Sequence, residues 1–327
     1  MASLLLFNPE NDLALAAGSA NYTPPAAALR IRRAGALLPM WFAHPGDFIL
    51  APPEMESAAA EMREKYRLHG KIFTSADIPE IDRCVPWGWS AHTVRTFRNA
   101  GISGEILPDS QKIERLRMLS HRRTSVAVLK ALAYGALPVE AFTVEEALDA
   151  VSSFGGSAYL KFPWSGSGRG VFPVAAGSDS LISLAAASVR RQGSVIIEPA
   201  YNAVTDFAML FYCTGGKAEF HGLSTFKTLP GGAYSGNIIA SQEYIAGSIG
   251  LAQSTLDSLR SRLEIALTGC VAHAYDGPVG VDMMIADKNG KQIVVPCIEV
   301  NLRYTMGFVA QAIASATSPE APRLLQI

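Results

Sequence analysis

The residues best suited to chemistry stand on two apolar segments joined by the tetrapeptide Asp287-Lys-Asn-Gly290. An Asn-Gly pair between apolar runs predicts a β-hairpin, because both residues accept the backbone conformation of a two-residue hairpin turn. Side chains alternate between the faces of a strand, so Asp282, Glu299 and Asn301 are then expected on one face. Two carboxylates and an amide oxygen form the oxygen-only ligand set that Mg²⁺ prefers.

Two alternatives compete with this metal site. A three- or five-residue loop would turn one strand over and separate the two carboxylates. The shared face could also be a charged, solvated surface without a ligand. Asp282 and Glu299, however, both stand among apolar neighbours in the sequence. Charges in such surroundings are usually paired or bound to a metal, which favours the metal site.

A second segment joins a lysine to a loop of glycines and serines. Lys161 ends an apolar strand and is followed by Phe-Pro-Trp and then by Ser165-Gly-Ser-Gly-Arg-Gly170. Glycines let a backbone approach phosphate oxygens, and Lys161 can reach the same phosphates as a point charge. The loop is neither a P-loop nor a dinucleotide fingerprint, because no Gly-Lys-[Ser/Thr] follows and it leads into a strand. Loop tips of this kind also occur without any ligand.

A third segment is an apolar strand that ends at Glu198 and leads past Tyr201 to Asp206. A connector between two lobes could offer backbone donors and acceptors to a purine ring, with an acid for ribose hydroxyls. By itself the pattern does not differ from an ordinary strand end.

Taken together and in order, these three segments resemble the ATP-grasp superfamily over roughly residues 110–310. The most specific part is Gly280-Val-Asp282 followed by Ile298-Glu-Val-Asn-Leu-Arg303, which is similar to the metal-binding strands of that family. The resemblance implies an ATP-dependent ligase that joins a carboxylate to an amine through an acyl phosphate, with Mg-ATP bound between two lobes. The alternatives with the same fold are a small-molecule kinase and a non-catalytic nucleotide-binding sensor or scaffold.

The resemblance also implies roles for the matching residues. Mg²⁺ or Mn²⁺ on the ATP phosphates would be held by Asp282, Glu299 and Asn301. The residues expected to act in catalysis are Lys161, Lys227 and Arg303. The residues expected to contact ATP are Arg122, Arg123, Lys161, Ser165, Gly166, Ser167, Gly168, Gly170, Glu198, Tyr201 and Asp206. Ser165–Gly170 matches a flexible loop over the phosphates, Glu198 and Tyr201 an adenine-binding segment, and Asp206 a ribose-binding acid.

The chain departs from the family pattern at two positively charged positions. The first nucleotide lysine is missing near residues 120–124, so Arg122 or Arg123 would have to replace it with a bulkier, forked group. Some ligases place an arginine where Gly280 stands here. Arg303 could stabilise the acyl phosphate in its place.

Two further segments allow two interpretations each. Lys227 lies in the glycine-rich segment 221–236, which fits an active-site lid and an exposed hairpin equally well. Glu10 and Asp12 follow the first strand, at the end where α/β sheets usually bind ligands. They could bind an amine-bearing substrate, but Asn-Pro-Glu-Asn-Asp is also good turn chemistry, and we favour the turn slightly.

Short apolar segments and helical segments alternate in the first third of the chain. The expected strands lie at 4–7, 37–43, 48–50, 71–73 and 84–87. This alternation is typical of an α/β unit with a largely parallel sheet. The segments 158–162 and 171–174 are expected to form two antiparallel strands around the glycine-rich loop. Thr143-x-x-Glu146 predicts a capped helix start, and 254–275 reads as one long helix among strands.

The expected fold class is therefore α/β (α+β), a two-lobed ATP-grasp fold behind a small α/β pre-ATP-grasp domain. The expected boundaries are 1–108 for the pre-domain, 109–198 for the N-terminal lobe and 199–327 for the C-terminal lobe. The expected partners are small-molecule carboxylates and amines, amino acids among them, and a homodimer is one possible assembly.

The composition narrows the function classes. Hydrophobic residues make up 49% and charged residues 17%, which excludes a disordered chain. The formal net charge of -1 gives no electrostatic case for nucleic-acid binding. The four cysteines lack metal-site spacing, the apolar start has no basic region before it, and no apolar run is long enough for a membrane span. A cytoplasmic protein with reduced thiols, bound to neither membrane nor nucleic acid, is expected.

Overall fold

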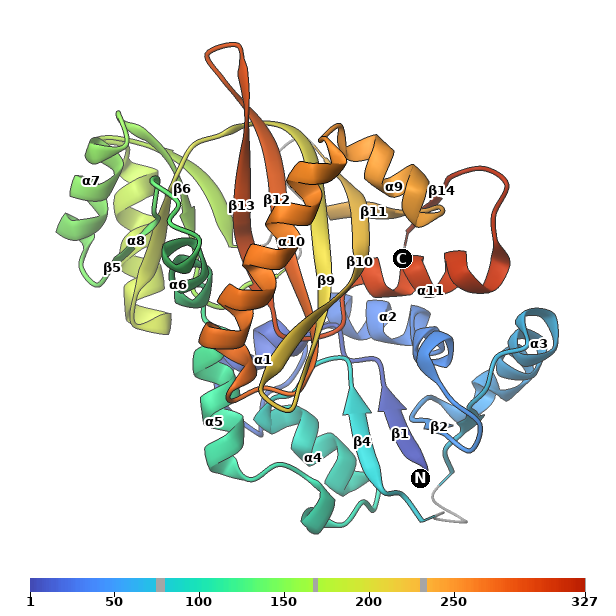
Figure 1. Ribbon diagram of the computed structural model, residues 1–327. Helices are drawn as coiled ribbons and strands as arrows, with labels where there is room; N and C mark the ends of the chain where they lie inside the picture. Colours follow the sequence, from blue (N-terminus) through green and yellow to red (C-terminus); the bar gives the residue numbers. More distant parts are fainter. Residues whose placement is uncertain (75–79, 167–169, 230–233, 327) are drawn as a thin grey trace. The chain divides into compact units, whose positions relative to one another are not determined.

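A computed structural model describes residues 1–74, 80–166, 170–229 and 234–326 (Figure 1). The chain divides into two compact units. The first unit contains Met1–Met118, Asn237–Ser241 and Arg303–Ile327, and the second contains Leu119–Gly236 and Gln242–Leu302. The division into three domains expected from the sequence stays a prediction. Within the described ranges, no helix has the length and apolar character that a membrane crossing requires.

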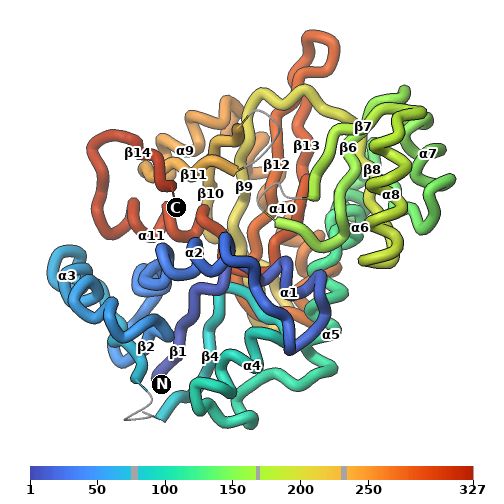
Figure 2. The backbone as a smooth tube through the Cα atoms, turned by 180° about the vertical axis from the view of Figure 1, so that it is seen from behind, coloured from blue at the N-terminus to red at the C-terminus, as the bar shows by residue number. Residues whose placement is uncertain are grey.

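The first unit is built on a four-stranded sheet in the order β3-β2-β1-β4, and the pairings β1–β2, β1–β4 and β2–β3 are all parallel. Its strands are β1 (Ser3–Leu6), β2 (Phe48–Ile49), β3 (Lys71–Ile72) and β4 (Arg83–Pro86). Its helices are α1 (Asn11–Ala17), α2 (Ala26–Ala34), α3 (Glu56–Tyr66), α4 (Ala91–Asn99) and α11 (Met306–Thr317), with 3₁₀ turns at Leu38–Phe42, Pro53–Met55 and Gly104–Ile106. The parallel sheet expected from the alternating pattern is confirmed, and Figure 2 shows it from behind.

The expected strand at 37–43 is wrong, because this segment forms the 3₁₀ turn Leu38–Phe42. Pro39 stands near the start of the turn, where its missing N–H costs nothing. Met40 is almost completely buried, so the apolar run reflects core packing and not a strand.

Asn8 fixes the loop that follows β1. Its side-chain amide donates to the Gly88 carbonyl (2.9 Å) and to Thr93 Oγ1 (3.0 Å), and the Gly88 N–H donates back to Asn8 Oδ1 (3.3 Å). A Cβ at position 88 would lie 2.5 Å from the end of the Asn11 side-chain amide, so glycine permits this close approach. The loops after β1 and β4 are thereby joined at the carboxyl end of the sheet.

The second unit contains two sheets. The smaller has the strand order β5-β8-β6-β7, with every neighbouring pair antiparallel. Its strands are β5 (Val139–Ala141), β6 (Ser157–Lys161), β7 (Val171–Ala175) and β8 (Val195–Pro199). The helices α7 (Val144–Ser153) and α8 (Asp179–Gln192) share a core with these strands and lie beside one another in Figures 1 and 2. The expected antiparallel pair around the glycine-rich loop is confirmed.

The expected helix start at Thr143 is also confirmed. The Glu146 N–H donates to Thr143 Oγ1 (3.1 Å), and α7 begins at the next residue, Val144. The Glu146 carboxylate reaches one residue farther back than a standard capping box and accepts from the Phe142 N–H (2.6 Å).

The larger sheet of the second unit is antiparallel in the order β13-β12-β9-β10. Its strands are β9 (Asn202–Thr214), β10 (Lys217–Thr228), β12 (Gly277–Lys288) and β13 (Lys291–Asn301). The remaining helices are α5 (Ser110–Leu119), which leads into this unit, α6 (Arg123–Ala131), α9 (Gln242–Ile249) and α10 (Gln253–Leu267). The expected long helix is α10, which continues only as a π turn over Thr268–Ala272. In the first unit, the end of β11 (Tyr234–Ile239) pairs with β14 (Arg323–Leu325).

Candidate active site

The hairpin between β12 and β13 closes with a two-residue turn. Lys288 is the cross-strand partner of Lys291, which leaves Asn289 and Gly290 as the turn residues. Both have positive φ angles, 57° and 77°, as two-residue hairpin turns of this type require. The turn predicted from the sequence is therefore confirmed.

A bulge then brings the two acids opposite one another. Met284 pairs with Val295, and the next pair along the ladder is Asp282 with Glu299. Between these two pairs β12 advances by two residues and β13 by four, so β13 contains two extra residues. The bulge contains Pro296, which cannot donate a ladder hydrogen bond and is tolerated at such irregularities. It inserts an even number of residues, so the face of each side chain is unchanged.

Asp282, Glu299 and Asn301 thus emerge beside one another from two paired strands. Asn301 Nδ2 donates to Asp282 Oδ2 (3.0 Å), which fixes the amide beside the first carboxylate. Glu299 Oε1 forms an ion pair with Arg122 Nη2 at 3.1 Å. Asn301 is buried, whereas the Glu299 side chain is 21% exposed. A ligand can therefore reach the carboxylate of this set from solvent.

Among the described residues, no group of three or more His, Cys, Asp and Glu side chains is arranged to hold a metal ion. The set on β12 and β13 contains only two such side chains, and its third member is an amide. Its donors are nevertheless all oxygens, the chemistry that Mg²⁺ selects. The residues present therefore fit a hard divalent cation that takes its remaining ligands from a bound molecule.

Lys161 and Glu198 form a buried ion pair on the smaller sheet. Lys161 is the partner of Ile196 across β6 and β8, so Glu198 is its diagonal neighbour on the same face. Less than a tenth of either side chain is exposed. Glu198 neutralises the lysine charge and holds the ammonium at the strand end, before the glycine-rich loop.

Arg122 connects that loop to the carboxylate pair. Its guanidinium donates to the carbonyl of Phe162 (3.2 Å) and to both the carbonyl (3.3 Å) and the Oγ (3.2 Å) of Ser165. The same guanidinium contacts Glu299. Arg123 instead pairs with Glu140 at 2.7 Å. Of the two arginines considered as replacements for the missing lysine, Arg122 is the one beside the candidate metal ligands.

Charged side chains of both sheets of the second unit act on the buried thiol of Cys297. Burial is the main cause that raises its pKa, and the carboxylates of Glu198 and Asp282 raise it further. A hydrogen bond with Ser125 and the charge of Lys161 act in the opposite direction. The Ser125 hydroxyl also accepts from the Val300 N–H (3.1 Å). Lys161 and Glu198 of the smaller sheet and Asp282 of the larger sheet therefore all lie within electrostatic reach of this thiol.

The residues assigned to the nucleoside lie along the connector and β9. Burial raises the pKa of the Tyr201 hydroxyl, which also shares a hydrogen bond with Tyr134. Burial raises the pKa of Asp206 as well, and a hydrogen bond from the Thr228 hydroxyl (3.0 Å) partly offsets this effect. Lys227 is exposed near the end of β10.

The glycine-rich loop is described only at its two ends. Ser165 is buried and Gly166 is half-buried, whereas Ser167 and Gly168 lie outside the described residues. Gly170 has a φ of 78°, and its carbonyl accepts from the Phe162 N–H (2.8 Å). This bond closes the base of the loop.

Arg303 forms an ion pair with Asp12, a contact that the sequence pattern does not predict. In the first unit its Nε and Nη2 atoms donate to the two oxygens of Asp12, at 3.1 and 2.8 Å. These residues are 291 positions apart, and no local spacing signals such a pair. The contacts of Arg122 were missed for the same reason.

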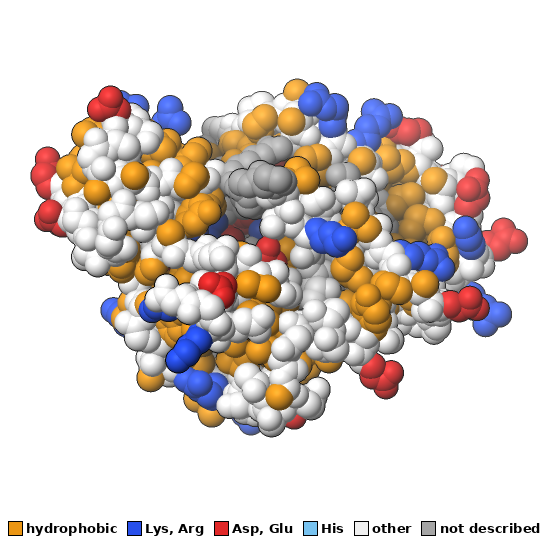
Figure 3. Space-filling view, turned by 90° about the horizontal axis from the view of Figure 1, so that it is seen from above, with side chains coloured by type: hydrophobic (Ala, Val, Ile, Leu, Met, Phe, Trp, Pro, Cys, Tyr) orange, Lys and Arg blue, Asp and Glu red, His pale blue; other side chains and the backbone are white. Residues whose placement is uncertain are grey.

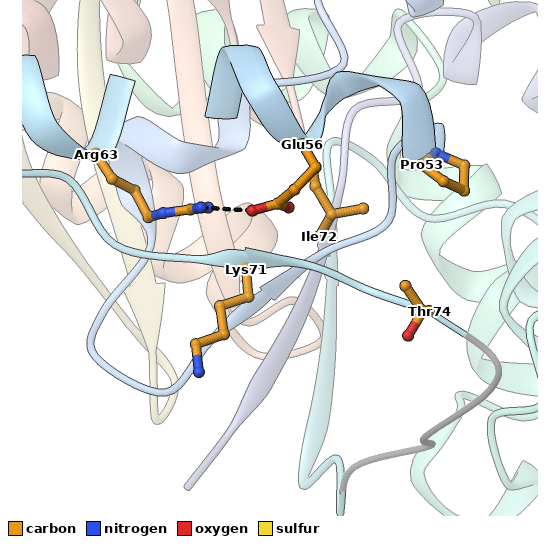
Figure 4. Close-up of a pocket in the computed structure, with 6 residues that line it drawn as sticks. All are labelled: Pro53, Glu56, Arg63, Lys71, Ile72 and Thr74. Atoms are coloured by element: carbon orange, nitrogen blue, oxygen red, sulfur yellow. Dashed lines mark hydrogen bonds and ion pairs between the residues drawn. The ribbon is translucent and has the colours of Figure 1, made fainter. Parts of the chain in front are cut away.

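A surface cavity of about 380 Å³ lies elsewhere in the first unit, as Figure 4 shows. It is lined by Pro53, Glu56, Arg63, Lys71, Ile72 and Thr74. Arg63 is already engaged by Glu56 (2.5 Å) and by the Gly70 carbonyl (3.1 Å). None of the predicted site residues lines this cavity. On the face drawn in Figure 3, basic and acidic side chains are interspersed.

No protein-family model matches the sequence, and no curated protein does either. Solved structures do match the fold. The biotin carboxylase domain of a Hydrogenobacter thermophilus 2-oxoglutarate carboxylase, in complex with MgADP and bicarbonate, has a TM-score of 0.53 at 13% identity, covering 98% of this chain and 70% of that one. D-alanyl-alanine synthetase A from Vibrio cholerae has a TM-score of 0.52 at 16% identity, covering 93% and 89%. Phosphoribosylamine–glycine ligase from Thermotoga maritima has a TM-score of 0.52 at 12% identity, covering 96% and 71%.

Proposed function

We propose that the protein, which has a mixed α/β structure with the ATP-grasp fold, is an ATP-dependent ligase that joins a carboxylate to an amine through an acyl phosphate. The observation that carries the proposal is the convergence of Asp282, Glu299 and Asn301 beside Arg122, in a unit that also holds the buried Lys161–Glu198 pair.

Mg²⁺ would be held by Asp282, Glu299 and Asn301. When bound, it would neutralise charge on the ATP phosphates, as divalent cations do in phosphoryl transfer. The protein would hold the three oxygen ligands in place before the cation binds. The cross-strand pairing of Asp282 with Glu299, and the hydrogen bond from Asn301, set these side chains in advance.

The cations of the site would bind the phosphates themselves. Lys161 lies in a strand and is oriented by Glu198, so its ammonium is a fixed point charge. Arg122 is held by backbone carbonyls and by Glu299, which fixes its guanidinium at the base of the loop. Preorganised charges of this kind stabilise a transition state because they need no reorganisation during the reaction.

The proposed reaction needs no covalent enzyme intermediate. A substrate carboxylate oxygen attacks the γ-phosphorus of ATP, and ADP leaves. The amine, after losing a proton, attacks the acyl carbon, and inorganic phosphate leaves with the electron pair of the broken C–O bond. Positioning and charge neutralisation are the main tasks of the protein. Glu198, Tyr201 and Asp206 are proposed to bind the nucleoside, and Arg303 and Lys227 to assist at the acyl phosphate.

The test measures ADP formation over pooled carboxylates and amino acids, followed by product analysis. A ligase yields ADP and an amide. ADP with a stable phosphorylated product would identify a kinase, and Mg-ATP binding without turnover would identify a sensor or scaffold. Either of these results overturns the ligase proposal.

The metal assignment is tested with Glu299→Gln, which preserves the size of the side chain. We expect turnover to fall by at least about 10–100-fold. Mutating residues that only hydrogen-bond to metal ligands already has an effect of this size, and Glu299 would be a ligand itself. Glu219→Gln is the matched control, because Glu219 is an exposed strand carboxylate on β10. Turnover of Glu299→Gln at the control rate would reject the assignment.

A further inference from the structure

A second polar cluster lies in the first unit, in the loop after β1. Glu10 is almost completely buried, with only 1% of its side chain exposed. Its Oε1 lies 3.2 Å from Arg32 Nη1 on α2, so its charge is paired. Within the part of the chain that the structure describes, however, neither carboxylate oxygen accepts a hydrogen bond. Buried polar atoms of folded proteins are rarely left in this state.

Two further buried atoms near Glu10 lack a hydrogen-bond partner among the described residues. They are the hydroxyl of Tyr22 and Nδ1 of His92. The two rings meet edge to face, with their centroids 5.6 Å apart. Burial raises the pKa of Tyr22, and the Glu10 charge raises it further. Burial, Arg32 and Arg95 lower the pKa of His92, while Glu10 and a hydrogen bond with the backbone of Ala20 oppose them. The Tyr22 and His92 rings therefore both lie within electrostatic reach of Glu10.

The chemistry of these atoms defines what would satisfy them. The Glu10 oxygens need N–H or O–H donors, and an ammonium supplies three. A simple cation would compete with Arg32 for Glu10, and a simple anion would compete with Glu10 for Arg32. A zwitterion brings one charge of each sign and leaves the cluster electrically balanced. Arg32 is 20% exposed, so the cluster has an edge open to solvent.

We propose that Glu10 and Arg32 bind the ammonium and the carboxylate of an α-amino acid, with Tyr22 and His92 as further polar contacts. The identification of this amino acid as a substrate rests on the proposed ligase function. The binding site itself stands on the unsatisfied buried atoms and the adjacent pair of opposite charges.

The experiment measures binding to the 327-residue chain, without ATP, by calorimetry. The probes are individual α-amino acids of both configurations. Each amino acid that binds is compared with its own decarboxylated amine and its own deaminated acid. We expect the amino acid to bind at least about tenfold more tightly than either fragment, since each lacks one charged hydrogen-bonding group. Equal binding of a fragment, or binding of no amino acid, would overturn the proposal.

The variant Glu10→Gln keeps the side-chain size and removes the charge. Its amino-acid affinity is expected to fall by at least about tenfold, while its affinity for Mg-ATP stays unchanged. Asp149→Asn is the matched control, because it removes one carboxylate from α7 in the other unit. Equal affinity of Glu10→Gln and wild type would overturn the site.

Two measurements cover the remaining outcomes. If Glu10→Gln does not fold, hydrogen exchange of the wild-type protein replaces it. Bound amino acid should then protect residues 8–12 and 90–93, and unchanged exchange there would refute the site. Glu299→Gln should retain amino-acid binding after losing turnover, which separates failure of this site from failure of the proposed reaction.

Discussion

Arg122 offers the sharpest test of how the candidate site is held together. Its side chain is only 5% exposed and contacts Glu299, the Phe162 carbonyl, and both the carbonyl and hydroxyl of Ser165. Arg122→Met keeps the apolar stem and removes every one of these bonds. The loss would leave one carboxylate and two carbonyls without their charged donor.

The expected cost follows from the burial of the two partners. Removing one member of a fully buried ion pair costs about 3–5 kcal/mol, because the other charge stays desolvated. Glu299 is 21% exposed and keeps part of its hydration, so we expect a loss of about 2–4 kcal/mol for Arg122→Met. Arg122→Lys keeps the charge, but one ammonium cannot replace a forked guanidinium at several acceptors. It should cost about 1–3 kcal/mol.

The assay is urea unfolding at equilibrium, with the midpoint shift read at constant slope. Arg123→Met is the matched control, since the Arg123 side chain is 42% exposed and its ion pair with Glu140 should contribute only about 0–1 kcal/mol. Combining Arg122→Met with Glu299→Gln should give a coupling energy of about 1–2 kcal/mol. A coupling below about 0.5 kcal/mol, or a wild-type midpoint for Arg122→Lys, would refute this reasoning.

Three further changes have defined outcomes. Gly170→Val places a Cβ 2.9 Å from the Ser165 Cβ, at a backbone φ of 78°. It should lower the free energy of unfolding by about 1–3 kcal/mol more than the control Gly177→Ala, because Gly177 has a similar φ of 74° but a Cβ there meets nothing within 4 Å. Equal urea midpoints for the two variants would contradict the clash. Burial raises the pKa of Cys84 to about 12, so the native thiol should resist alkylation at pH 8 and react on unfolding, with mass spectrometry of the labelled peptide as the readout. Because burial raises the pKa of Asp206, the folded state favours its neutral form, and that stabilisation is lost as pH rises through the folded pKa. Asp206→Asn should therefore raise the urea midpoint at pH 7 but not at pH 3, and equal shifts at both would contradict the assignment.

Local sequence signals made two features predictable, the turn of the β12–β13 hairpin and the N-terminal cap of α7. Asn289 and Gly290 adopt the positive φ angles that their residue types favour, and Thr143 caps α7. One expectation that rested on an apolar run alone was wrong. An apolar run such as 37–43 indicates burial, but burial alone does not distinguish a strand from a 3₁₀ turn. The helices α9 and α11 had no expected counterpart.

Long-range contacts were the part that the sequence could not supply. The Asp12–Arg303 pair and the bonds of Arg122 to Glu299 join segments that no periodicity relates. Glu10 illustrates the limit best. Its sequence context reads as turn chemistry, and only its burial without hydrogen bonds indicates another role.

The bulge at Pro296 shows why the face of the acids was predictable although their pairing was not. With the observed turn, a regular register would place position 297 opposite Asp282, yet the bulge brings Glu299 there instead. A one-residue bulge would have moved Glu299 and Asn301 to the opposite face. The two-residue insertion preserves the face and places the two carboxylates directly opposite one another. Two like charges facing each other across a ladder destabilise a sheet unless a cation or a donor lies between them. Arg122 and the Asn301 amide supply part of that compensation, and a bound metal would supply the rest.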